Sequence, residues 1–344
     1  MMKKIVVHKA GGYERLVVEN HPGLAPGPGE IVISVEAAGV NYADCCVRWG
    51  VYESARKYVG WPITPGFEVA GKVKAVGEGV KRWKAGDAVM AVTFFNGYAS
   101  EVKVPEIHAF PIPQGFSMAE AAGFPSVYMT AYHALHQLVR IRPGGTILVH
   151  SAAGGVGTAL LQLARSAGFR AIGVVGSSHK VEVAKRFGAD EVIDKSKVSL
   201  WDEAKRLAPD GYDAVLDANG AETLRQSYKH LAPTGKLIAY GSHTILPKEG
   251  GRLNYLKLAA GFLKIPRFHP LALLSDNKSV AGFNLSFLFA RTDLLDEGMG
   301  ALLAGVREGK IRPPVVNLYP FAESGRAHAA IESGKTVGKL ILEI

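Results

Sequence analysis

One short segment limits the folds open to this chain more than any other: a strand, a turn of small residues and a helix in direct succession. Residues 146–150 (Thr-Ile-Leu-Val-His) are an apolar run, and residues 151–157 (Ser-Ala-Ala-Gly-Gly-Val-Gly) follow as the turn. Apolar side chains then recur at helical spacing up to residue 164. Free N–H groups at the start of such a helix can bind a pyrophosphate if no bulky side chains block the backbone. The segment therefore predicts a dinucleotide site.

Within this turn, we expect Gly154, Gly155 and Val156 to offer N–H groups to the pyrophosphate, and Gly157 to let the helix pack closely on the strand. Ala152 stands where the G-x-G-x-x-G fingerprint has its first glycine. A glycine pattern alone is a weak signal, and the order of strand, turn and helix is what strengthens it.

The residues after the next strand indicate which cofactor is bound. An Asp or Glu about 20 positions on would bind the 2′-OH of NAD. The strand ending at Val175 instead runs into a polar turn that contains Ser177, Ser178 and Lys180. Since no carboxylate is present there to repel a 2′-phosphate, the two hydroxyls and the ammonium group favour NADPH. The serines could also simply cap the next helix.

The strand pattern divides the chain into two lobes. In residues 1–125, short strands lie between Pro and Gly turns, which indicates a mostly β lobe. The strands expected there are 31–36, 69–76, 88–92 and 101–104. After residue 125, strands alternate with helices of ten residues or more, which predicts an α/β fold with a doubly wound parallel sheet. Its expected strands are 145–150, 171–175, 191–194, 214–217, 236–240 and 280–285.

The end of the chain has a helical pattern over 294–307 and a last strand at 338–342 that could return to the first lobe. We therefore expect three segments: a first lobe at 1–125, a Rossmann nucleotide-binding domain at 126–286, and a C-terminal segment at 287–344 that rejoins the first lobe.

Composition sets limits on other functions. The net charge of +9 is spread along the chain without a nucleic-acid-binding motif, so we expect no nucleic-acid partner. The two cysteines, Cys45 and Cys46, are neighbours and can form neither a disulfide framework nor a four-cysteine zinc site. The apolar run after Met1 is too short for a signal peptide, so a cytoplasmic protein is expected.

The segment 246–274 is the most basic part of the chain. Its prolines and charges interrupt it too often for a membrane span. Basic and aromatic residues together leave peripheral membrane contact open, and a partly packed, solvated insertion is the alternative. Its basic residues are Lys248, Arg252, Lys257, Lys264 and Arg267.

Several motifs besides the glycine turn make the chain resemble a known family. They are residues 38–44 (AGVNYAD), 65–71 (PGFEVAG), 76–80 (VGEGV), 86–87 (GD), 130–132 (TAY), 282–285 (GFNL) and 337–339 (VGK). Together they resemble the medium-chain dehydrogenase/reductase superfamily, in particular its zinc-free quinone oxidoreductase branch and, within that branch, the VAT-1-like proteins. This resemblance implies a GroES-like, mostly β catalytic domain beside the Rossmann domain.

The family comparison also indicates that no metal is bound. Zinc alcohol dehydrogenases have a Cys-His pair where this chain has Asn41 and Tyr42, a His at Phe67 and a Cys near Ser126. Catalytic zinc needs three such ligands, and none of these residues offers a thiolate or an imidazole. The remaining metal-like pattern, the two histidines of residues 133–136, is expected to pack or to face solvent.

Without a metal, the cofactor must reduce an acceptor that is already electrophilic, such as a quinone or an α,β-unsaturated carbonyl. The resemblance places Asn41 beside the nicotinamide ribose, Tyr52 near the nicotinamide face and Thr130 at the carboxamide. It places other residues along the cofactor: Asn219, Gly241, Ser242, the backbone at Phe283, and Lys339. Asn41 could instead be a turn residue, Tyr52 a packing residue and Thr130 an ordinary helix residue.

Two departures from the branch concern the site. Lys195 replaces a Tyr near the adenosine phosphate and could pair with the 2′-phosphate. Cys46 replaces another Tyr, which leaves solvent or Tyr52 as the proton donor.

The sequence thus predicts an NADPH:quinone oxidoreductase-like enzyme with a quinone or enone substrate. The alternatives are a 2-enoyl thioester reductase and a non-enzymatic NADPH-binding protein associated with membranes. Resemblance also implies a homodimer joined through the strand at 281–285, since exposed edge strands can pair.

Overall fold

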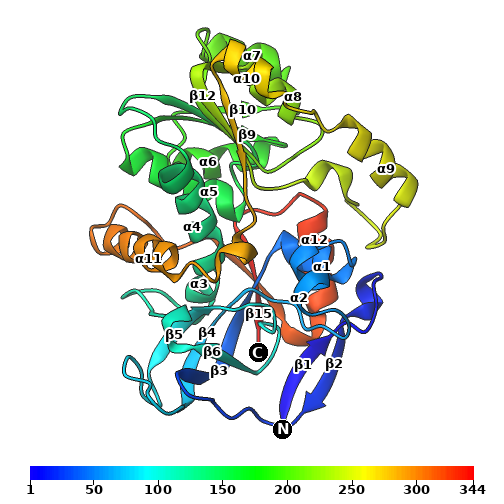
Figure 1. Ribbon diagram of the computed structural model, residues 1–344, viewed down its shortest axis with the longest axis vertical. Helices are drawn as coiled ribbons and strands as arrows, with labels where there is room; N and C mark the ends of the chain where they lie inside the picture. The colour runs from blue at the N-terminus through cyan, green and yellow to red at the C-terminus, as the bar shows by residue number, and fades with distance from the viewer.

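A computed structural model describes the whole chain, residues 1–344. Two lobes lie one above the other along the long axis (Figure 1). The upper lobe holds a parallel sheet, and the lower lobe holds a mostly antiparallel sheet together with both chain ends. The α/β class and the combination of a Rossmann sheet with a β lobe are confirmed.

The upper sheet has six parallel strands in the order β10-β9-β8-β11-β12-β13. Counted within the lobe, this is the order 3-2-1-4-5-6 of dinucleotide-binding folds, with the switch point between β8 and β11. The inner strands β8, β9 and β11 are buried on both faces, as apolar runs without alternation require, whereas the edge strands β10 and β13 are partly exposed. Their bounds are β8 Thr146–Val149, β9 Arg170–Val175, β10 Glu191–Asp194, β11 Tyr212–Asp217, β12 Leu231–Ala239 and β13 Ser279–Gly282.

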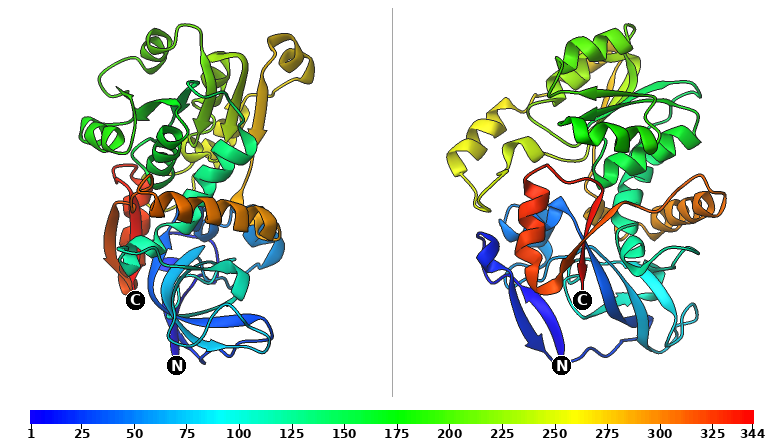
Figure 2. Two further views of the ribbon diagram at one scale, coloured as in Figure 1. Left: turned by 90° about the vertical axis from the view of Figure 1, so that its left-hand side faces the viewer. Right: turned by 180° about the vertical axis from the view of Figure 1, so that it is seen from behind.

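Helices cover this sheet and connect it to the lower lobe (Figure 2). The α-helices are α4 Pro125–Tyr132, α5 Gly155–Ser166, α6 Val181–Arg186, α7 Leu200–Leu207, α8 Leu224–Lys229, α9 Tyr255–Lys264, α10 Pro270–Asp276 and α11 Thr292–Arg307. Short helical turns are η3 His133–Leu138, η4 Ser178–Lys180, η5 His243–Ile245 and η6 Leu285–Leu288.

The lower sheet has the order β14-β15-β3-β4-β5-β7, and β6 also pairs with β3. A separate hairpin is formed by β1 and β2. The strands are β1 Met2–Val6, β2 Val17–His21, β3 Glu30–Val40, β4 Glu68–Val76, β5 Ala88–Val92, β6 Glu101–Pro105, β7 Ala109–Pro111, β14 Val316–Pro320 and β15 Lys339–Glu343. The helices are η1 Tyr13–Arg15, α1 Tyr42–Arg48, α2 Glu53–Tyr58, η2 Glu106–His108, α3 Met118–Ala122, η7 Phe321–Glu323 and α12 Ser324–Glu332.

The C-terminal segment contributes two strands to the lower sheet. Strand β15 runs antiparallel to β3, with Leu340 opposite Val40, and β14 lies parallel to β15 at the edge. Sequence patterning did not reveal β14 or α12. The edge strand β14 is only half buried, so it shows little of the apolar pattern that identifies an inner strand.

The last strand of the upper sheet is shorter than expected. The sequence predicted a strand over 280–285, but β13 ends at Gly282 and the chain leaves the sheet there. The side chain of Asn284 accepts a hydrogen bond from the N–H of Ser286, which starts η6. An asparagine that bonds the backbone two residues on favours a turn over a strand.

One apolar core joins the two lobes. The largest cluster of buried residues contains Met90 and Phe124 from the lower side together with Leu160 and Met299 from the upper side. A shared, close-packed core resists rearrangement, so side chains from both lobes can be held in fixed positions at the junction.

The segment 246–274 projects from the upper lobe, with α9 farthest from the sheet (Figure 1). None of the residues of α9 or α10 is fully buried. No helix in the structure combines the length and the apolar character needed to cross a bilayer.

Candidate functional site

The glycine turn connects β8 to α5 at the switch point of the upper sheet. Ser151 has a positive φ of 54°, and Gly154 is the N-cap of α5. A Cβ on Gly157 would overlap the carbonyl oxygen of Ser151, so only glycine allows the helix to start this close to the strand. The N–H groups of Gly155 and Val156 begin α5 and can face an anion, whereas the N–H of Gly154, which the sequence predicted as a third donor, donates to the carbonyl of Ser151 at 2.9 Å.

The loops after β11 and β12 lie next to this turn. The hydroxyl of Ser151 donates to Oδ1 of Asn219 at 3.1 Å. A Cβ on Gly241 would clash with the carbonyl of Ala218, so the two loops touch at backbone level. The structure thus brings Asn219, Gly241 and the adjoining Ser242 to the edge where dinucleotides bind in doubly wound sheets.

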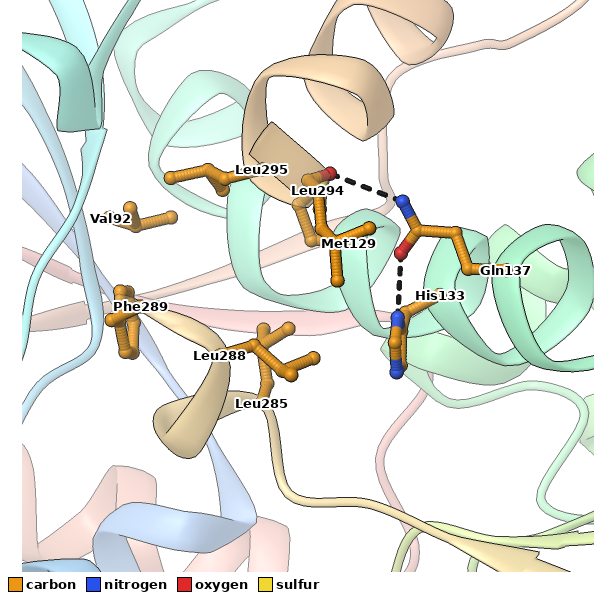
Figure 3. Close-up of a pocket in the computed structure, with 9 residues that line it drawn as sticks. All are labelled: Val92, Met129, His133, Gln137, Leu285, Leu288, Phe289, Leu294 and Leu295. Atoms are coloured by element: carbon orange, nitrogen blue, oxygen red, sulfur yellow. Dashed lines mark hydrogen bonds between the residues drawn. The ribbon is translucent and has the colours of Figure 1, made fainter. Parts of the chain in front are cut away.

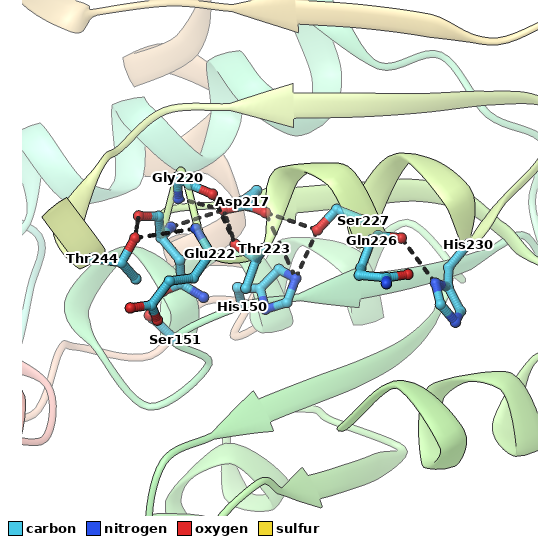
Figure 4. A network of polar contacts seen from close by, with 11 residues as sticks. His150, Ser151, Asp217, Gly220, Glu222, Thr223, Gln226, Ser227, His230 and Thr244 are labelled. Atoms are coloured by element: carbon cyan, nitrogen blue, oxygen red, sulfur yellow. Dashed lines mark hydrogen bonds and ion pairs between the residues drawn. The ribbon is translucent and has the colours of Figure 1, made fainter. Parts of the chain in front are cut away.

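A buried polar network supports these loops from below (Figure 4). Oδ1 of Asp217 accepts hydrogen bonds from the N–H groups of Asn219 and Gly220, at 2.8 and 3.0 Å. Its Oδ2 accepts from Ser227 at 2.8 Å, and the Ser227 oxygen lies 3.1 Å from Nε2 of His150. Burial lowers the pKa of His150, which favours the neutral ring.

Sequence reasoning assigned no role to His150 or Asp217. Their position could have identified them, because each lies at the carboxyl end of a strand that flanks the switch point. A polar residue at the end of an otherwise apolar strand is a good candidate for organising the loop that follows.

At the adenosine end, the structure changes the sequence-based expectation. The hydroxyl of Ser178 donates to the carboxylate of Asp194 at 2.6 Å, and Asp194 ends the neighbouring strand β10. The turn after β9 contains no Asp or Glu, as the sequence shows, but the neighbouring strand brings the Asp194 carboxylate to it, which the sequence did not predict. Neither Ser177 nor Ser178 caps the following helix through its side chain.

Lys180 and Lys195 supply positive charge at the same end. The ammonium group of Lys180 donates to the carbonyl of Gly334 at 2.5 Å, and burial, followed by the charge of Lys195, lowers the Lys180 pKa. Lys195 is exposed, and its Cε lies 3.7 Å from the position of a Cβ on Gly176. Lys195 can thus bind a phosphate directly, whereas Lys180 would first have to break its hydrogen bond to Gly334.

In the lower sheet, a buried ion pair connects the first residues of β15 and β4. Nζ of Lys339 lies 2.6 Å from Oε1 of Glu68 and donates to Oδ1 of Asn41 at 2.5 Å. The Asn41 amide in turn donates to Glu68 at 3.0 Å. The second oxygen of Glu68 accepts from the N–H of Ser126, and both charged side chains are almost fully buried.

This pair lies directly under the glycine turn. The N–H of Gly338 donates to the carbonyl of Ala153 at 2.9 Å, and Cδ of Lys339 lies 3.7 Å from a Cβ position on Gly155. The structure therefore brings Asn41 and Lys339 together with the start of α5. Glu68 was not recognised as a site residue from the sequence.

The positions that correspond to the zinc ligands do not fit a zinc ion. Asn41 is engaged with Lys339, Phe67 is an apolar side chain that is 5% exposed, and Ser126 offers only a hydroxyl. Glu68 is neutralised by an ammonium group. Zinc binds thiolates, imidazoles and free carboxylates, so this set of donors does not suit it.

Cys45, His328 and Glu332 form a group of three potential ligands elsewhere in the lower lobe. The guanidinium of Arg48 lies among them, 2.7 Å from Glu332 and 2.9 Å from Nδ1 of His328. Burial raises the pKa of the Cys45 thiol. With a cation already pairing the carboxylate, the group is a structural network that connects α1 to α12.

Tyr52 lies in an aromatic corner beside the lobe junction. Its ring contacts Phe67 and Phe95, with centroid distances of 5.5 and 6.3 Å. Its hydroxyl donates to Oδ1 of Asn284 at 2.8 Å and lies 3.4 Å from Ser286. Burial raises its pKa to about 12, so the phenol keeps its proton at neutral pH.

Thr130 lies on α4, and Phe283 directly follows β13. The Thr130 hydroxyl donates to the carbonyl of Ser126 within α4, as an ordinary helix residue can. The Phe283 ring packs on His133 at 4.7 Å. The roles of Thr130 and Phe283 toward a cofactor stay predictions.

A narrow apolar pocket adjoins His133 (Figure 3). Nδ1 of His133 is 2.6 Å from Oε1 of Gln137, whose amide donates to the carbonyl of Leu294. His133 therefore packs at the pocket wall, as expected for this histidine, while His136 is exposed. The lining residues are Val92, Met129, His133, Gln137, Leu285, Leu288, Phe289, Leu294 and Leu295.

The fold and the site together define a class: a two-lobed, dinucleotide-dependent oxidoreductase that lacks zinc ligands at the positions where zinc dehydrogenases have them. Comparison with known proteins agrees. The profile "Alcohol dehydrogenase GroES-like domain" matches residues 27–143, and "Zinc-binding dehydrogenase" matches residues 187–342. The chain belongs to the medium-chain dehydrogenase/reductase superfamily.

Two relatives and one structure show the range of this similarity. The chain is 35% identical over 343 residues to the rat synaptic vesicle membrane protein VAT-1 homolog, covering 99% of this chain and 84% of the relative. It is 31% identical to rat quinone oxidoreductase, covering 99% and 98%. The Escherichia coli quinone oxidoreductase solved with NADPH superposes with a TM-score of 0.86 at 28% identity, covering 99% and 100%.

Proposed function

We propose that this protein is an NADPH-dependent oxidoreductase that transfers hydride to a quinone or an α,β-unsaturated carbonyl without a metal ion. One observation carries the proposal: where the zinc dehydrogenases hold their metal, Lys339, Glu68 and Asn41 form a closed, hydrogen-bonded set beside Phe67. In zinc dehydrogenases the metal activates the alcohol as a Lewis acid, whereas a conjugated acceptor can take hydride directly.

The residues available in the cleft fit NADPH. The start of α5 would hold the pyrophosphate, and Asn41 and Lys339 would lie at the nicotinamide end. Ser177, Lys195 and, once its hydroxyl turns from Asp194, Ser178 would hold the 2′-phosphate. The bound nicotinamide supplies the hydride, and the protein's part is to bind, orient and exclude water. The complex of the similar E. coli enzyme with NADPH supports this assignment.

Tyr52 is the proposed source of the proton that follows the hydride, with water as the alternative. Its phenol is protonated at neutral pH and lies among aromatic rings that limit the access of water. Asn284 orients the hydroxyl through a hydrogen bond of 2.8 Å, and Ser286 lies 3.4 Å from it. A positioned acid of this kind can stabilise the enolate or quinol anion that forms on hydride arrival.

A panel of acceptors tests the proposal. NADPH absorbance would be followed with ortho- and para-quinones, 2-alkenals and crotonyl-CoA, with and without a chelator. We expect turnover with quinones or alkenals that the chelator leaves unchanged. Turnover restricted to crotonyl-CoA would instead identify a 2-enoyl thioester reductase. Binding of NADPH without reduction of any acceptor would contradict the reductase function.

A second candidate function, peripheral membrane contact, is favoured by the surface of α9. Four large side chains on this helix are 68–86% exposed: Tyr255, Leu256, Phe262 and Leu263. Between residues 250 and 275 there are basic residues and no Asp or Glu. Exposed apolar and basic side chains together suit an anionic lipid surface.

Co-sedimentation with vesicles tests this second function. Wild type is expected to sediment with vesicles that contain phosphatidylserine and not with phosphatidylcholine alone. The variant Leu256→Ser/Leu263→Ser keeps the charge of α9 and should lose most of the binding. Equal sedimentation of wild type and variant, or no dependence on anionic lipid, would contradict a lipid-binding role for α9.

A homodimer is also proposed. Strand β13 is the free edge of the upper sheet, so a second copy could pair with it. Because β13 ends at Gly282, the pairing would involve only residues 279–282. Light scattering would show a dimeric mass for wild type. A Val280→Pro variant, which removes a backbone donor at the edge, is expected to shift the mass toward the monomer.

A further inference from the structure

The carboxyl ends of β9 and β10 bring one carboxylate and two ammonium groups together. Asp194 is the last residue of β10 and lies opposite Val175, the last residue of β9. The chain then leaves β9 toward Ser178, whose hydroxyl donates to Oδ2 of Asp194 at 2.6 Å. In doubly wound folds, the second strand ends where the adenosine ribose binds, and here that strand is β9.

Asp194 is held in the ionised form. Its Oδ1 accepts from the N–H of Ser196 at 3.0 Å and from the Ser196 hydroxyl at 2.6 Å. The hydrogen bonds from Ser178 and Ser196 lower the pKa of Asp194. A negative charge is therefore fixed beside the serine that would bind the 2′-substituent of the ribose.

Lys195 has a charge opposite to that of Asp194. It directly follows Asp194, and its backbone N–H donates to the carbonyl of Val175 at 3.1 Å, so both side chains start from the same corner of the sheet. Lys180 is the second cation, but its ammonium group already bonds Gly334. A ribose bound at the end of β9 would thus have nearby groups that attract a 2′-phosphate and one that repels it.

We propose that Asp194 is a cofactor-specificity residue that weakens the binding of the 2′-phosphate of NADPH and allows the 2′-OH of NADH to bind. An ionised carboxylate repels a phosphate but accepts a hydrogen bond from a ribose hydroxyl. The protein therefore binds both dinucleotides, and its preference for NADPH is smaller than the two lysines alone would produce. This inference rests on the proposed dinucleotide-dependent function.

The variant Asp194→Asn tests the inference, because the amide oxygen can still accept from Ser196 while the charge is lost. Dissociation constants for NADPH and NADH would be measured by nucleotide fluorescence at low salt. We expect the ratio of NADH to NADPH dissociation constants to rise about tenfold in the variant, mainly through tighter NADPH binding. A ratio within about twofold of wild type would overturn the inference.

Two further variants separate local from general charge effects. Glu191→Gln removes the same charge at the exposed start of β10 and should leave the ratio unchanged. Lys195→Met should lower the ratio by weakening NADPH alone. An equal rise in the ratio for Glu191→Gln would show a general field effect and overturn the assignment to Asp194.

The failure of the inference can be told apart from the failure of the proposed function. If wild type binds neither dinucleotide, both are overturned. If it binds them and the Asp194→Asn ratio does not change, the dinucleotide-dependent function stands and only the role of Asp194 is overturned. Thermal unfolding of each variant would confirm that the fold is kept.

Discussion

The two ends of the proposed NADPH site differ in where they place their charges: one end buries them and the other exposes them. At the nicotinamide end, Lys339 and Glu68 form an ion pair with side chains that are 3% and 0% exposed. At the adenosine end, Asp194 and Lys195 carry opposite charges near the surface, and their partners are serine hydroxyls and solvent.

This difference in burial predicts a difference in what each end can tolerate. A buried charge that loses its partner is strongly destabilising, because it has no water to replace the partner. A surface charge is screened, so its removal changes affinity and leaves the fold intact. Substitutions at the nicotinamide end should therefore destabilise the fold, whereas substitutions at the adenosine end should change cofactor affinity and leave the fold intact. The following predictions test this comparison, from the largest expected effect to the smallest.

The largest effect is expected for Lys339→Met. The change leaves the Glu68 carboxylate buried and unpaired, and should lower the free energy of unfolding by about 3–5 kcal/mol. Urea denaturation would measure the loss. Lys335→Met, at an exposed position four residues earlier, is the control and should stay within about 0.5 kcal/mol of wild type. Partial recovery in Lys339→Met/Glu68→Gln would confirm the cause, and a single-variant loss below about 1 kcal/mol would contradict it.

Tyr52→Phe removes only the hydroxyl at the same end. If Tyr52 supplies the proton, kcat should fall on the order of 100-fold, while the dissociation constant of NADPH stays unchanged. Since burial raises the Tyr52 pKa to about 12, this group should cause no change in the wild-type rate between about pH 6 and about pH 9. An unchanged kcat in the variant would assign the proton to water.

Gly157→Ala tests the turn between the two ends. The new Cβ would overlap the carbonyl of Ser151, which should destabilise the protein by about 2 kcal/mol and weaken NADPH binding. Gly154→Ala is the matched control for stability, since its Cβ has 3.3 Å to the nearest atom and its φ is −81°. Equal unfolding free energies for the two variants would argue against a close approach at Gly157.

The smallest effect is expected for Ser178→Ala at the adenosine end. The variant loses one exposed hydroxyl, which donates to Asp194 in the structure and would have to turn from it to donate to a 2′-phosphate. NADPH binding should weaken by about 1 kcal/mol or less, with no measurable change in unfolding. Isothermal titration and thermal unfolding would check this. A clear loss of stability would show that the adenosine end, although exposed, does not tolerate substitution without damage to the fold.

Local sequence patterns predicted much of the fold. The strand expected at 88–92 coincides with β5, and the helix expected at 294–307 differs from α11 only by two residues at its start. The apolar side chains of these two elements recur with strand or helix periodicity, so the sequence alone predicts them. Strand β14 and helix α12 were missed. The strand predicted at 280–285 was too long, because the turn that ends it depends on a side-chain hydrogen bond of Asn284.

The site was predicted in part. The glycine turn, Asn41 and Lys339 were named from the sequence, and the structure brings them together. Asn41 and Lys339 are 298 positions apart, and no local pattern reveals that Glu68 joins them. Asp217 was likewise missed, because its role depends on loops that meet only after the parallel sheet has formed.

The sequence by itself determined two things: that the backbone can form a dinucleotide-binding turn, and that the site cannot bind catalytic zinc. Small residues at 151–157 allow a helix to start against a strand, and the residue types at 41, 67 and 126 offer no zinc ligands. The tertiary structure alone decided which charges face one another. Asp194 lies 16 positions after Ser178 in the sequence, yet β10 places its carboxylate 2.6 Å from that hydroxyl. Electrostatic effects depend on distance in space and on burial, and folding sets both.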